Sequence, residues 1–277
     1  MKPDTQIIPT AEPFFFPGEA GQPGCLLIHG FTGSPKEMCW MGEYLNQQGY
    51  PCLGIRLTGH ATRPKDMIRS RYTDWMLSVE DGYYLLHDAL PVGHQDGVSL
   101  SKGEMSDRIY LIGLSMGGML SLLMSTKLEV AGVVAMSTPY RIPYDFPAWA
   151  LKLASHFIRY QSQGKEEPGA SWFDKSAYVE HFSYPQNPVH SGAEVQILAS
   201  ELRASLPKVD VPVLLIHSKN DTYVLPENME HIYTDLGTPD KTKLYITESS
   251  HVVTRDAARN QVFEAASAFI RRIEAVA

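Results

Sequence analysis

A serine between two glycines is the pattern in this 277-residue chain that points most directly to chemistry. Residues 113–117 read Gly-Leu-Ser-Met-Gly, a G-x-S-x-G pattern, and another glycine follows. The apolar run 109–112 predicts a strand buried on both faces, and the apolar spacing after the pattern predicts a helix. In that context the pattern predicts a sharp turn that presents the Ser115 hydroxyl as a nucleophile. The alternative is a glycine-rich connection with an idle serine.

A serine nucleophile needs a base and an acid that orients the base. Functional residues of a parallel sheet gather at the carboxyl ends of its strands. A predicted strand at 211–217 runs into Asp221, and another at 243–247 runs into His251. The order Ser115, Asp221, His251 is one known for triads on such sheets. We predict that His251 takes the serine proton and returns it to a leaving alcohol, while Asp221 holds the imidazole.

Other acids and histidines fit these two roles less well. Asp210 precedes its predicted strand and so belongs at the wrong end of the sheet, and Asp235 ends a predicted surface helix. Glu248 lies near the expected base and is either a surface acid or a neighbour of the site. His217 falls inside or at the end of a strand, where a histidine usually has its polar atoms satisfied in the core.

The negative oxygen of an acyl-transfer intermediate needs two backbone N–H donors. We expect one from Met116, at the start of the helix after the serine. We expect the other from Phe31, which follows the pair His29-Gly30 at a predicted strand end. The Phe31 ring is also a candidate wall of the acyl pocket. His29 is expected to hold its loop by a hydrogen bond, and His60, in a second loop, to be an anchor and not a second base.

The elements that must position these residues alternate between strand and helix. Strands are predicted at 25–28, 50–57, 109–112, 130–136, 211–217 and 243–247, and helices near 34–48, 73–90, 227–236 and 255–275. This alternation predicts an α/β fold, a doubly wound and mainly parallel sheet with helices on both faces. Phe14-Phe15-Phe16 is expected to form a short edge strand. Ser34 is expected to cap a helix, with Pro35 as its first residue.

The rhythm of strands and helices stops after residue 137 and resumes near residue 207. Residues 138–206 contain many prolines, aromatic residues such as Trp149, Phe157 and Trp172, at least two predicted short helices and no convincing buried strand. We predict an inserted, largely helical cap at 138–206 on a core domain formed by 1–137 and 207–277. Its aromatic content favours an apolar pocket. Residues 91–107, which show no periodicity, are expected to form a surface connection.

Composition excludes several classes of function. A hydrophobic content of 44% and a charged content of 20% are typical of a globular protein in water. The formal net charge of −7 argues against a nucleic-acid partner. No apolar run reaches the roughly 18 residues that span a bilayer, and the N-terminal segment lacks a signal-peptide pattern, so a cytoplasmic location is expected. The three cysteines, Cys25, Cys39 and Cys52, predict free thiols, and no metal-site spacing is present.

The motifs HGFTG, GLSMGG and SSH occur in one chain, together with Asp221 in its C-terminal part. On these motifs the chain resembles the α/β-hydrolases, and more narrowly the small bacterial carboxylesterases and monoacylglycerol lipases. The resemblance continues through HGFTGSPKEM, the TGH loop, YTDW, HSKND and SSHVVTRD. It implies Ser115 as nucleophile, Asp221 and His251 as its partners, and the Phe31 and Met116 amides as the oxyanion hole, without metal or organic cofactor. The segments 91–107 and 138–206 depart from the family pattern. The resemblance therefore implies an ester of a monocarboxylic acid as substrate, without specifying its alcohol.

We expect a serine carboxylesterase that acts through an acyl-enzyme on small-molecule esters with an apolar acyl group. Thioesterases, acyltransferases, peptidases and C–C bond hydrolases use the same triad and stay open. Epoxide hydrolases and haloalkane dehalogenases are disfavoured because they carry an aspartate at the position of Ser115. Two further alternatives are a hydrolase-fold receptor for a small apolar ligand and an interfacial lipase that docks 148–160 on lipid. The sequence predicts no oligomeric state.

Overall fold

Seven strands form the main sheet, in the order β1-β3-β2-β6-β7-β10-β11. The computed structural model describes residues 6–90, 94–95, 98–99, 108–142, 147–162 and 169–276. The edge strand β1 runs antiparallel to β3 and all other neighbouring pairs are parallel, which confirms the predicted sheet. The strands are β1 (Phe14–Phe16), β2 (Gly24–Ile28), β3 (Cys52–Ile55), β6 (Ile109–Leu114), β7 (Gly132–Met136), β10 (Val213–Ser218) and β11 (Lys241–Ile246).

The central strands are buried on both faces because nearly all of their residues are apolar. Every residue of β2, β6, β7 and β10 is buried. Leu111 of β6 lies opposite Leu26 of β2 and Val133 of β7. Partners in a parallel register point to the same face, so these three side chains pack into one hydrophobic cluster.

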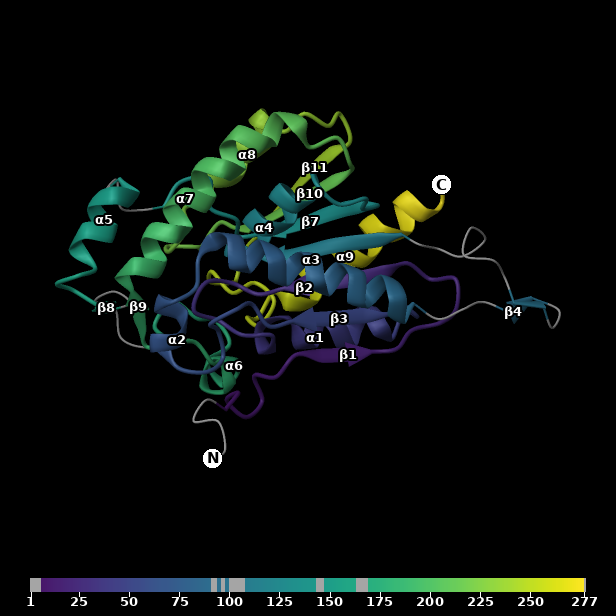
Figure 1. Cartoon of the computed structure of the whole chain (residues 1–277). Helices are drawn as coiled ribbons and strands as arrows, with labels where there is room; N and C mark the ends of the chain where they lie inside the picture. The colour runs from purple at the N-terminus through teal and green to yellow at the C-terminus, as the bar shows by residue number, and fades with distance from the viewer. Residues whose placement is uncertain are drawn as a thin grey trace.

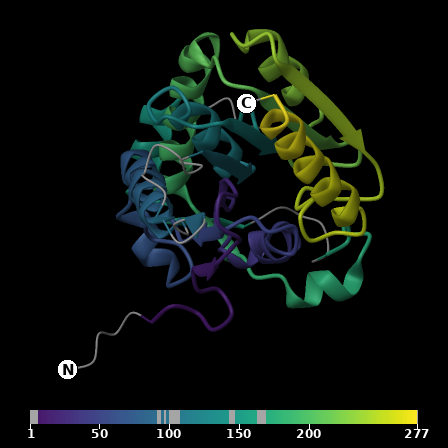
Figure 2. The same cartoon turned by 90° about the vertical axis from the view of Figure 1, so that its right-hand side faces the viewer.

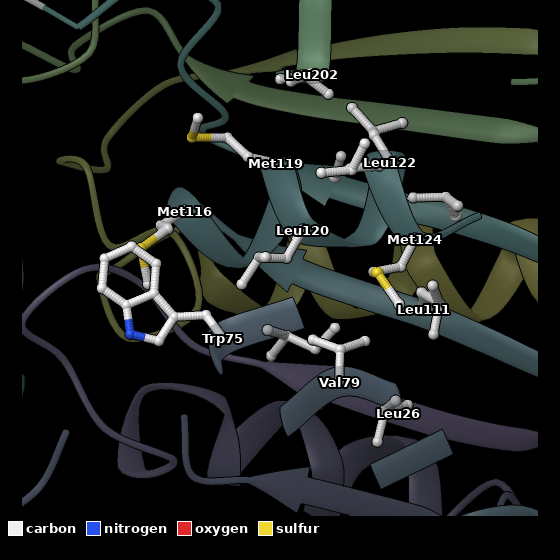
Figure 3. Packing of buried hydrophobic residues seen from close by; sticks show 14 of the residues in the cluster. Leu26, Trp75, Val79, Leu111, Met116, Met119, Leu120, Leu122, Met124 and Leu202 are labelled. Carbon is white, nitrogen blue, oxygen red and sulfur yellow. The ribbon is translucent and has the colours of Figure 1, made fainter. Parts of the chain in front are cut away.

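Helices cover both faces of the sheet (Figures 1 and 2). On one face lie α1 (Lys36–Asn46) and α9 (Arg259–Glu274), whose apolar residues join one hydrophobic cluster. On the other face lie α3 (Tyr72–Ala89), α4 (Met116–Met124) and α8 (Glu227–Asp235), which contribute to the second cluster. Figure 3 shows part of this second cluster, in which Leu120 of α4 points toward Trp75 and Val79 of α3.

The start of α1 differs from the sequence prediction. The helix begins at Lys36, so Pro35 precedes it, and the Ser34 hydroxyl makes no hydrogen bond to any described residue. The N–H of Glu37 already bonds the Ser34 carbonyl oxygen at 3.0 Å, and Met38 N–H bonds the Pro35 carbonyl at 2.9 Å. The predicted serine cap is therefore wrong, because a backbone turn satisfies the donor that the hydroxyl was expected to bind.

The segment 138–206 lies between β7 and β10 in the chain. It contains α5 (Ala148–Ala154), β8 (Tyr160–Ser162), α6 (Lys175–Glu180), β9 (Gln186–Pro188) and α7 (Val189–Ser205). β8 and β9 pair antiparallel and are mostly not buried. Helix α7 differs from the rest, because its Val195, Leu198 and Leu202 are buried in the same cluster as α4 (Figure 3). The division of the chain into a core domain and a cap at 138–206 stays a prediction.

The remaining elements are short. They are α2 (Pro64–Ile68), the 3-10 helix η2 (Leu206–Lys208) and the paired strands β4 (His94–Gln95) and β5 (Val98–Ser99). The rest of the predicted surface connection 91–107 lies outside the described residues. Cys25, Cys39 and Cys52 are free thiols, as expected. In the part of the chain that the structure describes, no helix is both long and apolar enough to cross a bilayer.

Candidate active site

Ser115 occupies a sharp turn between β6 and α4. It follows the last residue of β6 directly, and α4 begins at the next residue. Its φ of 54° and ψ of −116° are rare for a residue with a side chain, and its N–H donates to the Met136 carbonyl at 2.7 Å. Such strain persists only where the surrounding structure holds it, as the neighbouring strand does here.

The glycines two positions before and after Ser115 make this turn possible. A Cβ at Gly113 would lie 2.1 Å from the carbonyl oxygen of Gly117. A Cβ at Gly117 would lie 2.1 Å from the carbonyl oxygen of Ile28 in β2. Both distances are far below the van der Waals contact distance, and the atoms that a Cβ would meet belong to the backbone. Neither position therefore accepts a side chain. The predicted strand–turn–helix geometry is present at Ser115.

Asp221 and His251, which follow β10 and β11, are brought together. Nδ1 of His251 donates to Oδ2 of Asp221 at 2.7 Å, because a carboxylate can only accept. The other oxygen, Oδ1, accepts the N–H groups of Tyr223 and Val224, each at 2.9 Å. Burial raises the pKa of Asp221, but the charge of His251 and these hydrogen bonds outweigh it and hold the pKa well below its usual range. The carboxylate is therefore charged and fixed in orientation.

His217 contacts the same carboxylate from a second side. Its Nε2 lies 2.8 Å from the carbonyl oxygen of Val224 and 3.3 Å from Oδ2 of Asp221. The residue is 1% exposed. This agrees with its interpretation as a satisfied core histidine, and it adds a contact that steadies Asp221.

The imidazole of His251 lies at the edge of the protein interior. Its side chain is 18% exposed, and the Tyr223 ring lies 5.0 Å away between centroids. Burial lowers the pKa of His251, but the charge and hydrogen bond of Asp221, helped by Glu37, raise it above its usual value. No hydrogen bond joins the Ser115 hydroxyl to His251 among the described residues. Contacts of this kind often tighten only when substrate binds.

The loop after β2 lies beside Ser115. A Cβ added to Gly30 would be 3.4 Å from Cβ of Ser115. The loop is closed by a hydrogen bond from Gly33 N–H to the Gly30 carbonyl at 3.2 Å. Within the described ranges, neither Phe31 N–H nor Met116 N–H donates a hydrogen bond. Their assignment as oxyanion donors stays a prediction.

The two histidines in the neighbouring loops serve as anchors, as expected. Nδ1 of His29 bonds its neighbour's carbonyl at 2.9 Å, and Leu57 N–H donates to its Nε2 at 3.2 Å. Burial lowers the pKa of His29 to about 4. His60 is fully buried, 5.0 Å from His29 between ring centroids, and burial together with that neighbour lowers its pKa as well. Both rings are therefore neutral near pH 7.

None of the three rival acids is bonded to His251 among the described residues. Asp210 is exposed before β10. Asp235 accepts a hydrogen bond from the Tyr140 hydroxyl at 2.6 Å. Glu248 is exposed, and its N–H donates to Asn220 at 3.1 Å. The preference for Asp221 over these acids agrees with the geometry.

Sequence reasoning missed two buried carboxyl groups next to the site. Asp256 is fully buried, and its Oδ2 accepts the N–H of Ser250, the residue before His251, at 2.6 Å. Its Oδ1 accepts the N–H groups of Phe173, Asp174 and Ala257. Glu37, in the first turn of α1, accepts the Gly30 N–H at 2.9 Å. Glu37 lies within HGFTGSPKEM and Asp256 within SSHVVTRD, two stretches that carry the resemblance, but no role was predicted for either acid. The glycines at 30 and 33 are a signal that something packs closely against their loop.

Comparison with known proteins places this geometry in context. The family described as "Serine aminopeptidase, S33" matches residues 22–258. A carboxylesterase of Bacillus subtilis (strain 168) is 26% identical over 96% of this chain and 98% of its own length. A thermostable monoacylglycerol lipase of Bacillus sp. (strain H-257) is 29% identical over 98% and 99%. A solved structure from work on LipS and LipT, two metagenome-derived lipolytic enzymes, superposes with a TM-score of 0.81 at 28% identity, over 96% of this chain and 100% of its own.

Proposed function

Because the chain belongs to the serine aminopeptidase S33 family, we propose that it hydrolyses carboxylic esters through a covalent acyl-enzyme. It is an ester-hydrolysing enzyme of the serine esterase and monoacylglycerol lipase type, as its relatives over nearly the full chain are. The substrate that we propose is a small ester with an apolar acyl group. The partly buried Phe31, which packs 6.3 Å from Trp75 between ring centroids, supports this choice as a wall of the pocket.

In the proposed reaction, Oγ of Ser115 attacks the ester carbonyl carbon while Nε2 of His251 takes its proton. The carbonyl oxygen becomes an oxyanion that the N–H groups of Phe31 and Met116 bind. When the intermediate collapses, His251 gives its proton to the departing alcohol. Water then attacks the acyl-enzyme with His251 again as base, and the carboxylic acid leaves.

One observation carries this proposal above the others. The hydrogen bond from Nδ1 of His251 to Asp221 fixes the tautomer in which Nε2 is the proton acceptor. Asp221 also stabilises the imidazolium that forms once the proton has moved. Combined with the strained turn at Ser115, this pair has the chemistry that acyl transfer requires.

The decisive experiment compares wild type, Ser115→Ala and Ser125→Ala on p-nitrophenyl esters from acetate to palmitate and on a monoacylglycerol. Ser125, at the end of α4, is the matched control because its hydroxyl only bonds the Leu122 carbonyl. We expect Ser115→Ala alone to lose activity and labelling by a serine-directed phosphonate. Full activity in Ser115→Ala would contradict the mechanism.

Additional substrates distinguish ester hydrolysis from the related reactions that use the same triad. Thioesters, amino-acid p-nitroanilides and added alcohol as a competing nucleophile test for thioesterase, aminopeptidase and acyltransferase activity. Multiple rapid turnovers on an ester would argue against a receptor role, whereas tight binding with one slow turnover would favour it. A rate increase above the critical micelle concentration of the substrate would point to an interfacial lipase.

A further inference from the structure

Glu37 joins two loops that carry parts of the candidate site. Its Oε2 accepts the Gly30 N–H at 2.9 Å, in the loop that also contains Phe31. Its backbone carbonyl accepts the Thr254 hydroxyl at 2.6 Å, in the segment that follows His251. An acid in the first turn of a helix usually faces solvent, but the Glu37 side chain is only 6% exposed.

The loop after β2 is shaped around this carboxyl group. A Cβ at Gly33 would lie 2.3 Å from both carboxyl oxygens of Glu37. A Cβ at Gly30 would lie 3.4 Å from Oε2 and also 3.4 Å from Cβ of Ser115. The carboxyl group therefore fills the space against which the loop is folded, and only Gly30 separates it from the turn at Ser115.

Three ionisable groups face Glu37 from the elements packed around it. Nε2 of His181 lies 3.8 Å from Oε1, while His251 and Arg255 act on it through their charges. Burial raises the pKa of Glu37 to about 7, against the opposing effect of the Gly30 N–H and of these charges. Burial lowers the pKa of His181 to about 4, so this imidazole is neutral where Glu37 titrates.

Arg255 is held apart from Glu37 by its own contacts. Its guanidinium lies over the Trp40 ring, 3.3 Å from the centroid, and it is 1% exposed. Its Nη2 lies 3.6 Å from Oε2 of Glu180. No hydrogen bond joins Arg255 to Glu37 among the described residues, so the bond to Gly30 is the direct contact that the carboxyl group makes with the loop.

We propose that Glu37 is a positioning residue for ester hydrolysis, whose carboxyl group holds the Gly30 N–H and so fixes the loop that presents the Phe31 N–H to the reacting carbonyl oxygen. The proposal rests on the proposed function, because it assigns Glu37 to the oxyanion site of that reaction. A hydrogen bond to Gly30 needs only an oxygen acceptor, so either charge state of the carboxyl group maintains it. The charge has a separate effect, since an ionised Glu37 favours the imidazolium of His251.

Three variants separate the effect of the length of the Glu37 side chain from the effect of its charge. Glu37→Gln keeps the acceptor and removes the charge, Glu37→Asp keeps the charge and shortens the side chain, and Glu37→Ala removes both. We expect kcat of Glu37→Gln to stay within about threefold of wild type, while Glu37→Asp and Glu37→Ala lose roughly tenfold or more with little change in KM, because the loop matters most when the oxyanion forms.

The pH profile supplies an independent readout. On the acid limb of the profile, kcat/KM rises as His251 loses its proton. Removal of the Glu37 charge lowers the pKa of His251, so the acid limb should move to lower pH in Glu37→Gln and Glu37→Ala, and not in Glu37→Asp. A role confined to packing would leave the acid limb where it is in the nearly isosteric Glu37→Gln.

The control is Glu43→Ala, an exposed acid on the same helix, which should match wild type in kcat and in pH profile. The proposal is overturned if Glu37→Ala keeps kcat within about twofold of wild type, or if Glu37→Gln loses as much as Glu37→Ala. If Glu37→Ala does not fold, as judged by near-UV circular dichroism, the comparison of kcat between Glu37→Gln and Glu37→Asp tests the proposal. Activity in Ser115→Ala would instead refute the proposed function, so the two failures are distinguishable.

Discussion

The carboxylate of Asp221 and the imidazole of His251 share a hydrogen bond of 2.7 Å, and the acid is 2% exposed. Replacement by asparagine would place an amide at this point, whose NH₂ group favours the wrong histidine tautomer. We expect Asp221→Asn to lower kcat by about 10³- to 10⁴-fold with little change in KM. Steady-state kinetics on a short p-nitrophenyl ester test this, with the exposed Asp210→Asn as the control that keeps the wild-type rate. Equal loss in both variants would refute the assignment of Asp221.

Glu37 should make the folding stability depend on pH. Its pKa is about 7 in the folded protein and 4.5 in its unperturbed state. The folded state therefore keeps this proton longer, and the contribution to stability, complete below about pH 4.5, is lost as the pH rises through about 7. The full effect is on the order of 3 kcal/mol. Thermal melts should show that Glu37→Gln gains stability relative to wild type between about pH 5 and pH 8. A constant difference between the two melting temperatures would contradict this.

Two helical glycines, Gly117 and Gly192, should respond in opposite ways to alanine because only one of them lacks room for a Cβ. At Gly117 the new Cβ would meet the Ile28 carbonyl oxygen at 2.1 Å, whereas at Gly192 in α7 nothing lies within 4 Å. We expect Gly117→Ala to lose roughly 3 kcal/mol or more, or not to fold. Gly192→Ala should gain about 0.5–1 kcal/mol from helix propensity. Urea unfolding measures both, and a stable Gly117→Ala would show that the turn at Ser115 can relax.

Asp256 should be needed for both stability and rate. Its carboxylate accepts N–H groups from the segments on either side of it, among them Ser250 and Asp174. Asp256→Ala leaves these buried donors unpaired, so we expect a loss of roughly 3 kcal/mol together with a lower kcat as the His251 loop loosens. Asp240→Ala, which breaks the exposed ion pair with Arg272, is the matched control and should cost less than about 1 kcal/mol. Chemical denaturation and kcat would be measured together.

The sheet and the arrangement of Asp221 and His251 could be predicted because they follow from local pattern. Continuous apolar runs mark buried parallel strands, and residues just past their carboxyl ends must share one edge of the sheet. Ser115 carries its own signal in the two glycines that its turn requires.

The rest depends on packing between distant segments, which no local pattern records. Glu37 resembles any acid that complements a helix dipole, and its burial arises only from contacts with the Gly30 loop and with Thr254. The incorrect prediction of a Ser34 cap has the same origin. The local sequence matches a helix cap, but Ser34 is buried and its backbone carbonyl, not its hydroxyl, accepts the Glu37 N–H. Asp256 follows no strand end, and its partners include Phe173, which is 83 residues away in sequence.

Helix α7 has a consequence for how this scaffold can be recombined. Its Leu198 and Leu202 pack with α4, the helix that follows Ser115, and the small strand β9 comes just before it. A chimaera that exchanged all of 138–206 with a relative would import a foreign surface into the interior and disturb the support of the nucleophile turn. A graft that ends at residue 188 leaves α7 in place. It must still retain Tyr184, which is buried in the same cluster, and the Phe173 and Asp174 N–H groups that bond Asp256.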